Sequence, residues 1–212
     1  MASHQTRVIS ITQLNQVVID KQEDKDRFTQ AWKKLVLTGG PNDERRLLHA
    51  LEQLAKQTAI GGTGKQPTPQ QDTKITSVDQ LLAQADTVSA TFHKQLKAIV
   101  KQCGGEYQPG PNKSRARAVE KMENDYDGDH TKLVDIVRAS GIFPNFLCLA
   151  MAVDILMSSD CALIVVRAKD RFNKPTDFGY KDMLLNVRLE GSDHVGELQL
   201  HLAPIIEVKP AW

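Results

Sequence analysis

Apolar side chains in the first half of the chain recur every three or four residues, which places them on one face of a helix. One such stripe runs through residues 24–36, and a second follows Pro41, a residue that is common in the first turn of helices. A third begins after Ser77, which has Gln80 at the spacing of an N-terminal capping box. We expect helices over residues 24–36, from Pro41 onward and from Ser77 to residue 100, and a short strand or an irregular lead-in over residues 8–20.

The second half of the chain changes to short apolar runs with alternating or β-branched side chains, which are typical of strands. A polar loop is expected over residues 106–112, and helices over residues 114–123 and 146–157. The expected strands are residues 133–143, 162–168, 183–189 and 195–202. This order predicts an α+β fold with a mixed sheet of four to five strands flanked by helices.

Residues 60–74 separate the first two helices from the rest of the chain and are rich in Gly, Pro, Gln and Thr. Such a composition is typical of a linker or a mobile loop. We therefore expect a helical N-terminal region over residues 1–59, the loop, and one α+β domain over residues 75–212. No pattern in the sequence indicates an oligomeric state.

The composition argues against several classes of function. Among the 212 residues, 27 basic and 26 acidic side chains nearly cancel, so no strong attraction to nucleic acid or to a membrane surface is expected. The longest apolar run, near residues 142–157, is interrupted by Pro144 and Asp154 and is too short to span a bilayer. The N-terminus lacks the order of a signal peptide. The three cysteines form no C-x-x-C pair, which favours buried free thiols in a reducing cytoplasm over a zinc site.

Two short motifs resemble ligand-binding loops but lack residues that such loops need. GGTGK, residues 61–65, resembles a phosphate-binding loop, yet Ala59 and Gln66 occupy the positions of the first Gly and the final Ser or Thr. DYDGDH, residues 125–130, resembles the beginning of a calcium loop, but its sixth residue is not Gly. We interpret the first as a flexible linker and the second as a polar turn.

Charged residues with a chemical spacing begin after residue 112. Lys113, Arg117 and Lys121 are four apart and would share one face of a helix, where like charges repel. A bound polyphosphate would remove that repulsion, although a solvated basic face would show the same spacing. Asp135 and Arg138 then interrupt a β-branched run. A metal ion would suit the Asp and a nucleobase or phosphate the Arg, whereas a local ion pair or an edge strand would also explain both.

A third cluster is VVRAKDRFNKPTDFGYKD, residues 165–182. Its basic side chains before the aromatic pair are Arg167, Lys169, Arg171 and Lys174. Tyr180 follows the flexible Gly179, and its ring could stack on a nucleobase. Alternatively, the ring could cap the core and expose only its hydroxyl.

The last strand alternates strictly, with Glu197, Gln199 and His201 on one face and leucines on the other. Glu, Gln and His are poor strand formers, so a polar face built from them is informative. Together with the basic and aromatic clusters, Asp135 and Glu197 supply the parts of a magnesium-dependent phosphoryl-type transfer. Oxygen ligands would hold the ion, cations would bind phosphates, and a carboxylate would act on a hydroxyl.

The order of these motifs resembles the synthetase domain of the RelA/SpoT alarmone synthetases. The resemblance covers residues 77–202, and its most specific parts are K-D-x-x-x-K-P…G-Y, residues 169–180, and E-x-Q, residues 197–199. It implies a nucleotidyltransferase-like fold and the transfer of pyrophosphate from ATP to the 3′-hydroxyl of a nucleotide. GDP or GTP is the expected acceptor, with an adenine nucleotide or an RNA 3′ end as alternatives.

By position, the resemblance implies a role for each motif. Asp135 and Glu197 would bind Mg²⁺, and Glu197 would also act on the attacking hydroxyl. Tyr180 would stack on the acceptor base with Gln199 beside it, and Arg138 would stack on the donor adenine. Donor or acceptor phosphates would meet the basic side chains of Lys113, Arg117, Lys121, Lys169, Arg171 and Lys174.

The chain departs from the family pattern at several positions. Pro111 replaces an Arg, Arg117 a Ser, Leu184 a His, and His201, in the acceptor site, an Arg. These changes affect the grip on substrates more than the binding of metal. They leave two alternatives open: a non-catalytic nucleotide-binding or protein-interaction module, and a toxin or effector that uses the same chemistry in a target cell. Nothing resembles the histidine–aspartate metal set of the family's hydrolase domain.

Overall fold

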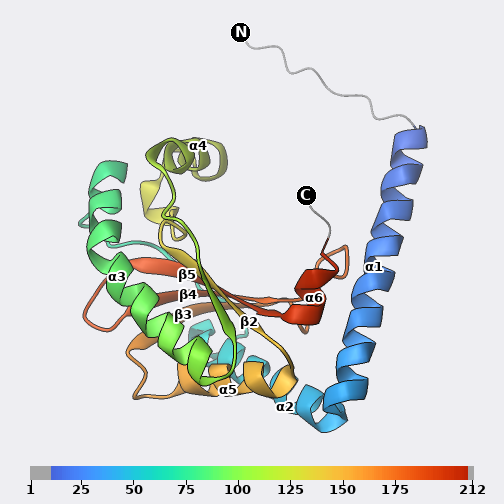
Figure 1. Ribbon diagram of the computed structural model, residues 1–212. Helices are drawn as coiled ribbons and strands as arrows, with labels where there is room; N and C mark the ends of the chain where they lie inside the picture. Colours follow the sequence, from blue (N-terminus) through green and yellow to red (C-terminus); the bar gives the residue numbers. More distant parts are fainter. Residues whose placement is uncertain (1–10, 210–212) are drawn as a thin grey trace.

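The fold is known from a computed structural model, which describes the backbone of residues 11–209 and the side chains of residues 20–209 apart from residue 62. The helices are α1 (Ile11–Gly39), α2 (Pro41–Thr58), α3 (Val78–Gln102), α4 (Arg115–Tyr126), α5 (Phe146–Met157) and α6 (Ala203–Glu207), as Figure 1 shows. The strands are β1 (Glu106–Pro109), β2 (Arg138–Phe143), β3 (Leu163–Asp170), β4 (Met183–Leu189) and β5 (Val195–Leu202). Short 3-10 turns lie at Ile60–Gly62 and His130–Lys132.

The strands form one sheet in the order β1-β2-β5-β4-β3. β2 and β5 run parallel, and the other neighbouring strands run antiparallel. The predicted α+β class and the mixed sheet flanked by helices are therefore confirmed. The sheet places the alternating strand β5 at its centre, between β2 and β4, so its polar face has neighbours on both sides.

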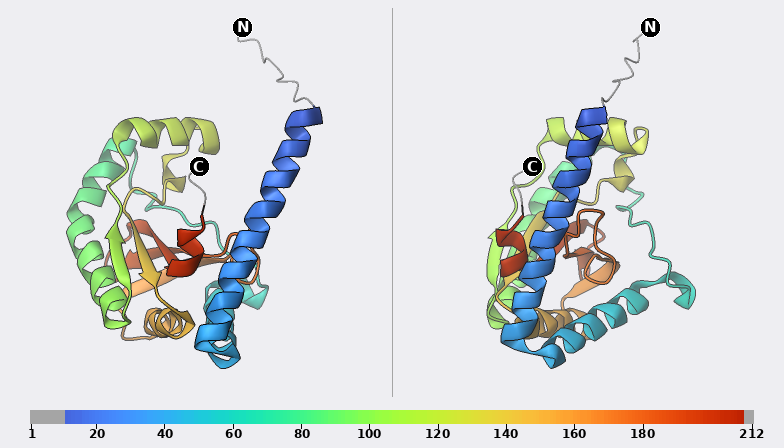
Figure 2. Two further views of the ribbon diagram at one scale, coloured as in Figure 1. Left: turned by 45° about the vertical axis from the view of Figure 1, so that its right-hand side comes forward. Right: turned by 90° about the vertical axis from the view of Figure 1, so that its right-hand side faces the viewer.

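Three helices, α2, α3 and α5, pack on the apolar face of the sheet, the face to which Leu198 and Leu200 of β5 point. Glycine permits a close approach here, since a side-chain carbon at Gly196 would lie 2.8 Å from the ring of Phe92 in α3. Figure 2 shows α1 standing at the opposite end of the molecule from α3 and α4, beside α6. The polar face of β5 is thus left uncovered by the three packed helices.

The structure corrects three expectations about local elements. Residues 11–20 belong to the helix α1 rather than to a strand or lead-in, because a helix that has formed extends at little cost; residues 8–10 lie outside the described residues. The expected loop at 106–112 contains β1, which pairs with β2. The expected strand at 133–143 begins only at Arg138, because residues 133–137 make separate hydrogen bonds, such as Lys113 N–H to the Ile136 carbonyl, instead of a ladder.

The loop at residues 60–74 contains only a 3-10 turn, but it is anchored to the sheet through Gln71. The buried Gln71 amide donates to the carbonyls of Leu133 and Val195 and accepts from the Val195 N–H, each over 2.8 Å. It thereby satisfies backbone groups at the start of β5. The division of the chain into two regions at this loop stays a prediction.

The N-terminal helices and the sheet share one hydrophobic core. Phe28 of α1 and Leu47 of α2 are as deeply buried as Leu185 and Leu200 of the sheet, and all belong to the same cluster. Within the described residues, no helix combines the length and the apolar character that a membrane crossing requires.

Candidate active site

The polar face of the sheet collects side chains from four strands. Residues in register on neighbouring strands point to the same face, so the register identifies the rows of this face. The first row is Arg138, Glu197, Asn186 and Arg167, and the second is Ser140, Gln199, Leu184 and Lys169. The sheet therefore brings Arg138 of β2 beside Glu197 and Gln199 of β5.

Asp135 lies at the edge of this face and is held by two lysines. Its Oδ2 accepts hydrogen bonds from Lys113 Nζ over 2.6 Å and from Lys121 Nζ over 2.8 Å. Burial alone would raise the pKa of Asp135, but the bonds from the two ammonium groups outweigh it and hold that pKa below its ordinary value. The other oxygen, Oδ1, is buried without a hydrogen-bond partner among the described residues.

The three basic residues that were expected on one helix face divide into two groups. Lys113 precedes α4, whose N-cap is Ser114, whereas Lys121 lies within the helix. Both side chains nevertheless form ion pairs with Asp135. Arg117 instead pairs with Glu120 over 2.8 Å, and its side chain is 75% exposed. Two of the three cations are therefore at the carboxylate, and the third, paired with Glu120, lines the cavity beside them.

Two adjoining cavities share Arg138 as a wall. The larger, about 730 Å³, is lined by residues of α4 and the preceding loop, including Lys113, Arg117 and Lys121. The smaller, about 260 Å³, contains Glu197 and Gln199. Arg138 Nε donates to the Pro111 carbonyl over 3.3 Å, which fixes its stem between them. A basic cavity of nucleotide size thus adjoins a carboxylate and an amide.

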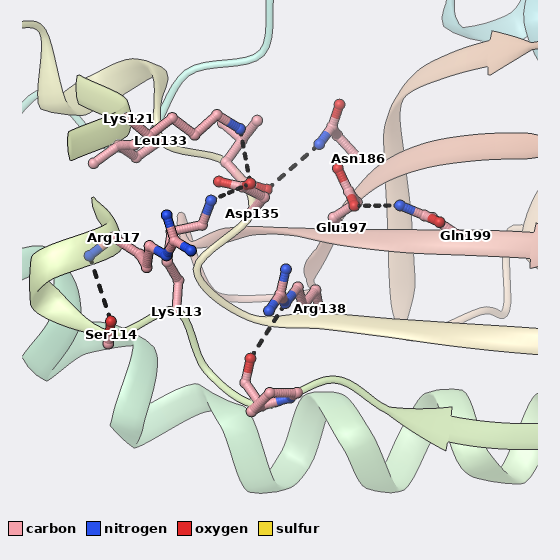
Figure 3. Close-up of polar contacts among 12 residues, drawn as sticks. Lys113, Ser114, Arg117, Lys121, Leu133, Asp135, Arg138, Asn186, Glu197 and Gln199 are labelled. Carbon is pink, nitrogen blue, oxygen red and sulfur yellow. Dashed lines mark hydrogen bonds and ion pairs between the residues drawn. The ribbon is translucent and has the colours of Figure 1, made fainter. Parts of the chain in front are cut away.

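Glu197 and Asn186 lie side by side on this face (Figure 3). Gln199 Nε2 donates to Glu197 Oε1 over 2.8 Å, which restrains the half-buried carboxylate. Asn186 is 1% exposed, and its Nδ2 lies 3.5 Å from the Val134 carbonyl. Sequence reasoning missed Asn186, although a lone amide inside the apolar run of β4 was a visible signal.

Tyr180 and His201 occupy the other end of the polar face, and both are buried. The Tyr180 hydroxyl lies 2.9 Å from His201 Nδ1, and its ring meets Phe28 of α1 edge-on at 5.4 Å between centroids. Lys209 Nζ lies 4.7 Å from the centroid of the same ring. Burial raises the pKa of Tyr180 and lowers that of His201 to about 4. The ring that was expected to stack on a base is therefore covered by the protein itself.

The remaining predicted phosphate ligands lie away from the Asp135 end. Arg171 makes a two-pronged pair with Asp182, in which one guanidinium N–H to carboxylate distance is 2.6 Å. Lys169 and Lys174 line a third cavity of about 620 Å³, between the β3 edge of the sheet and α2, which shares no lining residue with the other two. The structure thus separates Lys113 and Lys121 from Lys169 and Lys174.

The carboxylates of the site can accommodate a hard cation. The described residues contain no group of three or more His, Cys, Asp or Glu side chains with metal-binding geometry. Mg²⁺, however, commonly uses only one or two carboxylates and completes its shell with water and substrate phosphates. The unpaired Asp135 Oδ1 and the half-buried Glu197 fit that donor set, since both offer oxygen.

Comparison with known proteins places the fold. No protein-family model and no curated protein matches the sequence. The Type VI effector Tas1, solved with its immunity protein, is 24% identical with a TM-score of 0.50; the match covers 62% of this chain and 66% of Tas1, slightly less than two thirds. A GTP pyrophosphokinase family protein from Streptococcus pneumoniae is 16% identical with a TM-score of 0.50, over 60% of this chain and 71% of that one.

A third solved structure is the small alarmone synthetase 1 from Bacillus subtilis bound to its product pppGpp. It is 15% identical, has a TM-score of 0.48, and covers 59% of this chain and 72% of its own. At these identities, the likeness to Tas1 and to the streptococcal protein shows a common fold. The predicted fold of the alarmone-synthetase domain is therefore confirmed, on the same mixed sheet that carries Glu197 and Gln199.

Proposed function

We propose that the protein transfers pyrophosphate from ATP to a hydroxyl group of an acceptor nucleotide. The observation that carries the proposal is the pair of adjoining cavities, one basic and one containing Glu197 and Gln199, with Arg138 between them. This arrangement offers a place for a triphosphate next to a place for a nucleophile, with Pro111 and Arg138 in the walls of both. The fold shared with a GTP pyrophosphokinase family protein supports the same reading.

ATP would occupy the larger cavity. Arg138, from the shared wall, would stack on the adenine, and Lys113, Arg117 and Lys121 would contact its phosphates. Lysine and arginine form charge-assisted hydrogen bonds with phosphate oxygens, and the arginine fork binds two at once. Asp135 and Glu197 would hold Mg²⁺, which would supply positive charge to offset the negative charge of the phosphates.

Glu197 would accept the proton of the attacking hydroxyl. The acceptor oxygen forms a bond to the β-phosphorus of ATP while the bond from that phosphorus to the α,β-bridging oxygen breaks, and AMP leaves. A positioned carboxylate contributes about 10²- to 10⁴-fold to such a step. The hydrogen bond from Gln199 restrains one oxygen of Glu197 and leaves the other for the hydroxyl.

The acceptor would lie along the second row of the polar face, from Gln199 toward Lys169, with its base at Tyr180 and His201. Stacking on Tyr180 requires Phe28 of α1 to leave the ring. Lys169, Arg171 and Lys174 remain candidates for its phosphates, although Arg171 would first have to release Asp182. GDP or GTP is the proposed acceptor, and an adenine nucleotide or an RNA 3′ end is the alternative.

A second proposal concerns where the reaction is used. The likeness to the Type VI effector Tas1 favours a toxin that would deplete the nucleotides of a target cell by the same transfer reaction. Expression of the chain and of a Glu197→Gln variant would test this proposal. Growth arrest with the first and normal growth with the second would support an effector, and equal growth of both cultures would contradict it.

The transfer itself is tested by incubating the protein with ATP, Mg²⁺ and one acceptor at a time, followed by mass analysis. The acceptors are GDP, GTP, ADP, AMP and a short RNA. We expect one class of acceptor to gain the mass of two phosphate groups while AMP accumulates. Tight nucleotide binding without any such product would favour the non-catalytic module instead.

A further inference from the structure

Three lysines line the cavity of about 620 Å³ between α2 and the β3 edge of the sheet: Lys56 of α2, Lys169 of β3 and Lys174 of the turn after β3. Among the described residues, Lys169 and Lys174 form no ion pair, and Lys56 pairs only with Glu52 of its own helix. The side chains of that pair are 60% and 55% exposed, and such pairs contribute little stability. All three ammonium groups are therefore available to an anion that enters the cavity.

The wall of this cavity carries more positive than negative charge. Its two carboxylates, Glu52 and Asp170, face four cations, because Arg171 also lines it. Arg171 is held by Asp182, and Asp170 accepts hydrogen bonds from backbone N–H groups of the turn that follows it. Neighbouring cations repel one another, and an anion with several charges would offset that repulsion.

One side of the cavity is fixed by Gln66, from the loop that follows α2. Its Oε1 accepts from the Ala168 N–H of β3 over 2.9 Å, and its Nε2 donates to the Ala55 carbonyl of α2 over 2.7 Å. The amide thus ties α2 to the outer edge of β3. Lys56 is thereby held at a set place beside the strand that bears Lys169.

The cavity lies at the end of the second row of the polar face. In that row Gln199 of β5, Leu184 of β4 and Lys169 of β3 are in register. Two strand spacings, about 10 Å, separate the backbones of Gln199 and Lys169. In a nucleotide the 5′-phosphate chain leads away from the 3′-hydroxyl. An acceptor whose hydroxyl lies at Glu197 therefore directs that chain past Lys169 into the cavity.

We propose that this cavity binds the 5′-di- or triphosphate of the acceptor and that Lys56 supplies one of the cations. The inference rests on the proposed function and names its acceptor class, a mononucleotide with a 5′-phosphate chain. Lys56 lies outside residues 77–202, the part of the chain that resembles the alarmone synthetases. A helix without any recognised chemistry thus completes the acceptor site.

The charge of the cavity favours a phosphate chain over the end of an RNA. Each phosphodiester of an RNA carries one negative charge, whereas a 5′-triphosphate concentrates several charges on adjacent groups. Ammonium groups bind phosphate oxygens through charge-assisted hydrogen bonds. Three lysines around one cavity match the triphosphate better than a single diester.

The rival explanation is that Lys56 only stabilises α2 through its pair with Glu52. Two substitutions separate the explanations, because Lys56→Gln and Glu52→Gln break the same ion pair. A ligand role predicts that Lys56→Gln weakens the binding of the phosphate chain, whereas Glu52→Gln frees the lysine and keeps or strengthens it. A structural role predicts that both variants act alike.

The test is calorimetry with GMP, GDP and GTP and with the corresponding adenine nucleotides. An ATP analogue with a methylene group between its α- and β-phosphorus atoms, which cannot donate pyrophosphate, saturates the donor cavity throughout. In the series that binds, we expect affinity to rise about 10-fold from mono- to triphosphate. Lys56→Gln should lower triphosphate affinity about two- to fivefold and leave monophosphate affinity unchanged. Lys97→Gln, at an exposed position of α3, is the control and should match the wild type.

Four results would overturn the inference: binding of neither series, equal affinity for mono- and triphosphate, no change in Lys56→Gln, or equal losses in Lys56→Gln and Glu52→Gln. Because the analogue cannot react, these titrations do not depend on transfer. If Lys56 controls triphosphate binding and no acceptor is pyrophosphorylated, the phosphate site stands and the proposed function falls. If transfer occurs and triphosphate binding ignores Lys56, the proposed function stands without this site.

Discussion

The two ends of the polar face of the sheet differ in whether their buried polar groups have hydrogen-bond partners. At the Asp135 end, Asp135 and Asn186 each bury an oxygen without a partner, and Glu197 is half-exposed. At the Tyr180 end, Arg171 pairs with Asp182, and the Tyr180 hydroxyl bonds to His201. Unpaired buried groups cost stability and need an explanation such as a bound ligand or water, whereas paired networks hold a fold together. The comparison places the transfer chemistry at the Asp135 end. At the Tyr180 end, where the acceptor base is proposed to stack, it shows paired groups that support the fold.

The largest expected effect on the transfer rate is at the Asp135 end. Glu197→Gln should lower the transfer rate by about 10²- to 10⁴-fold, because an amide cannot accept the proton of the hydroxyl. The side chain keeps its size, so the midpoint of thermal unfolding should change little. Glu190→Gln, at the exposed turn before β5, is the matched control and should retain the wild-type rate. An undiminished rate in Glu197→Gln would remove that residue from the mechanism.

The second prediction concerns the stability of the fold at the Tyr180 end. Arg171→Ala leaves the carboxylate of Asp182, whose side chain is 1% exposed, without its cation. We expect the free energy of unfolding in urea to fall by about 3–5 kcal/mol, the typical cost of breaking a buried pair from one side. Arg188→Ala, which breaks an exposed pair with Asp193, should cost about 0–1 kcal/mol.

A double variant, Arg171→Met with Asp182→Leu, should recover most of the stability lost in Arg171→Ala, because no unpaired charge is then buried. If Arg171→Ala instead kept full stability and raised only the KM for the acceptor, Arg171 would be a substrate ligand. The Tyr180 end would then hold substrate as the Asp135 end does, and the difference between the two ends would be refuted.

The third prediction uses the pH dependence of His201. Burial lowers its folded pKa to about 4, while the unfolded chain has the ordinary value of about 6.5. The unfolded state therefore binds the proton more readily, so this contribution to stability is complete above pH 6.5 and is lost as the pH falls toward 4. His194 is lowered to about 4 for the same reason. Each should contribute up to about 3 kcal/mol.

Urea unfolding of the wild type and of His201→Gln across this range measures that contribution. Glutamine can still accept from Tyr180 but does not titrate, so its variant should lose less stability on acidification. Equal losses in both proteins would show that His201 is not held neutral by the fold. The Tyr180 end would then lack the buried hydrogen bond between Tyr180 and a neutral His201.

The smallest expected effect concerns the cover over Tyr180. Lys21 of α1 lies 3.4 Å from Asp177 and over the ring of Phe178, so it fastens the helix to the turn before Tyr180. If α1 must release Tyr180 for stacking, Lys21→Ala should lower the acceptor KM by about two- to fivefold, the equivalent of an exposed ion pair. The KM for ATP should stay constant. A higher acceptor KM would show that the cover assists binding instead.

The sequence predicted elements whose pattern is local. Strict alternation identified β5 and its polar face, and the apolar run of residues 146–157 matches α5. It missed Asn186, because only the register of β4 against β5 reveals that this residue faces Glu197. It also missed the burial of Tyr180, since the covering Phe28 comes from a helix far away in the chain. Local patterns carry no information about such tertiary partners.

Lys113 shows a further limit of prediction from residue spacing. Its spacing from Lys121 suggested one helix face, yet Ser114 caps the helix after it. The two lysines still meet at Asp135, because the loop before α4 bonds to residue 136 and carries Lys113 alongside. The two lysines therefore meet through the path of the loop and not through a shared helix face, and spacing alone could not show this.

The most direct test of the central claim is phosphorus NMR of the protein with ATP, Mg²⁺ and the preferred acceptor. Pyrophosphate transfer predicts AMP and a pyrophosphorylated acceptor in equal amounts, formed by the wild type and not by Glu197→Gln. Formation of ADP with a monophosphorylated acceptor, or bound ATP that is never consumed with any acceptor, would contradict the account.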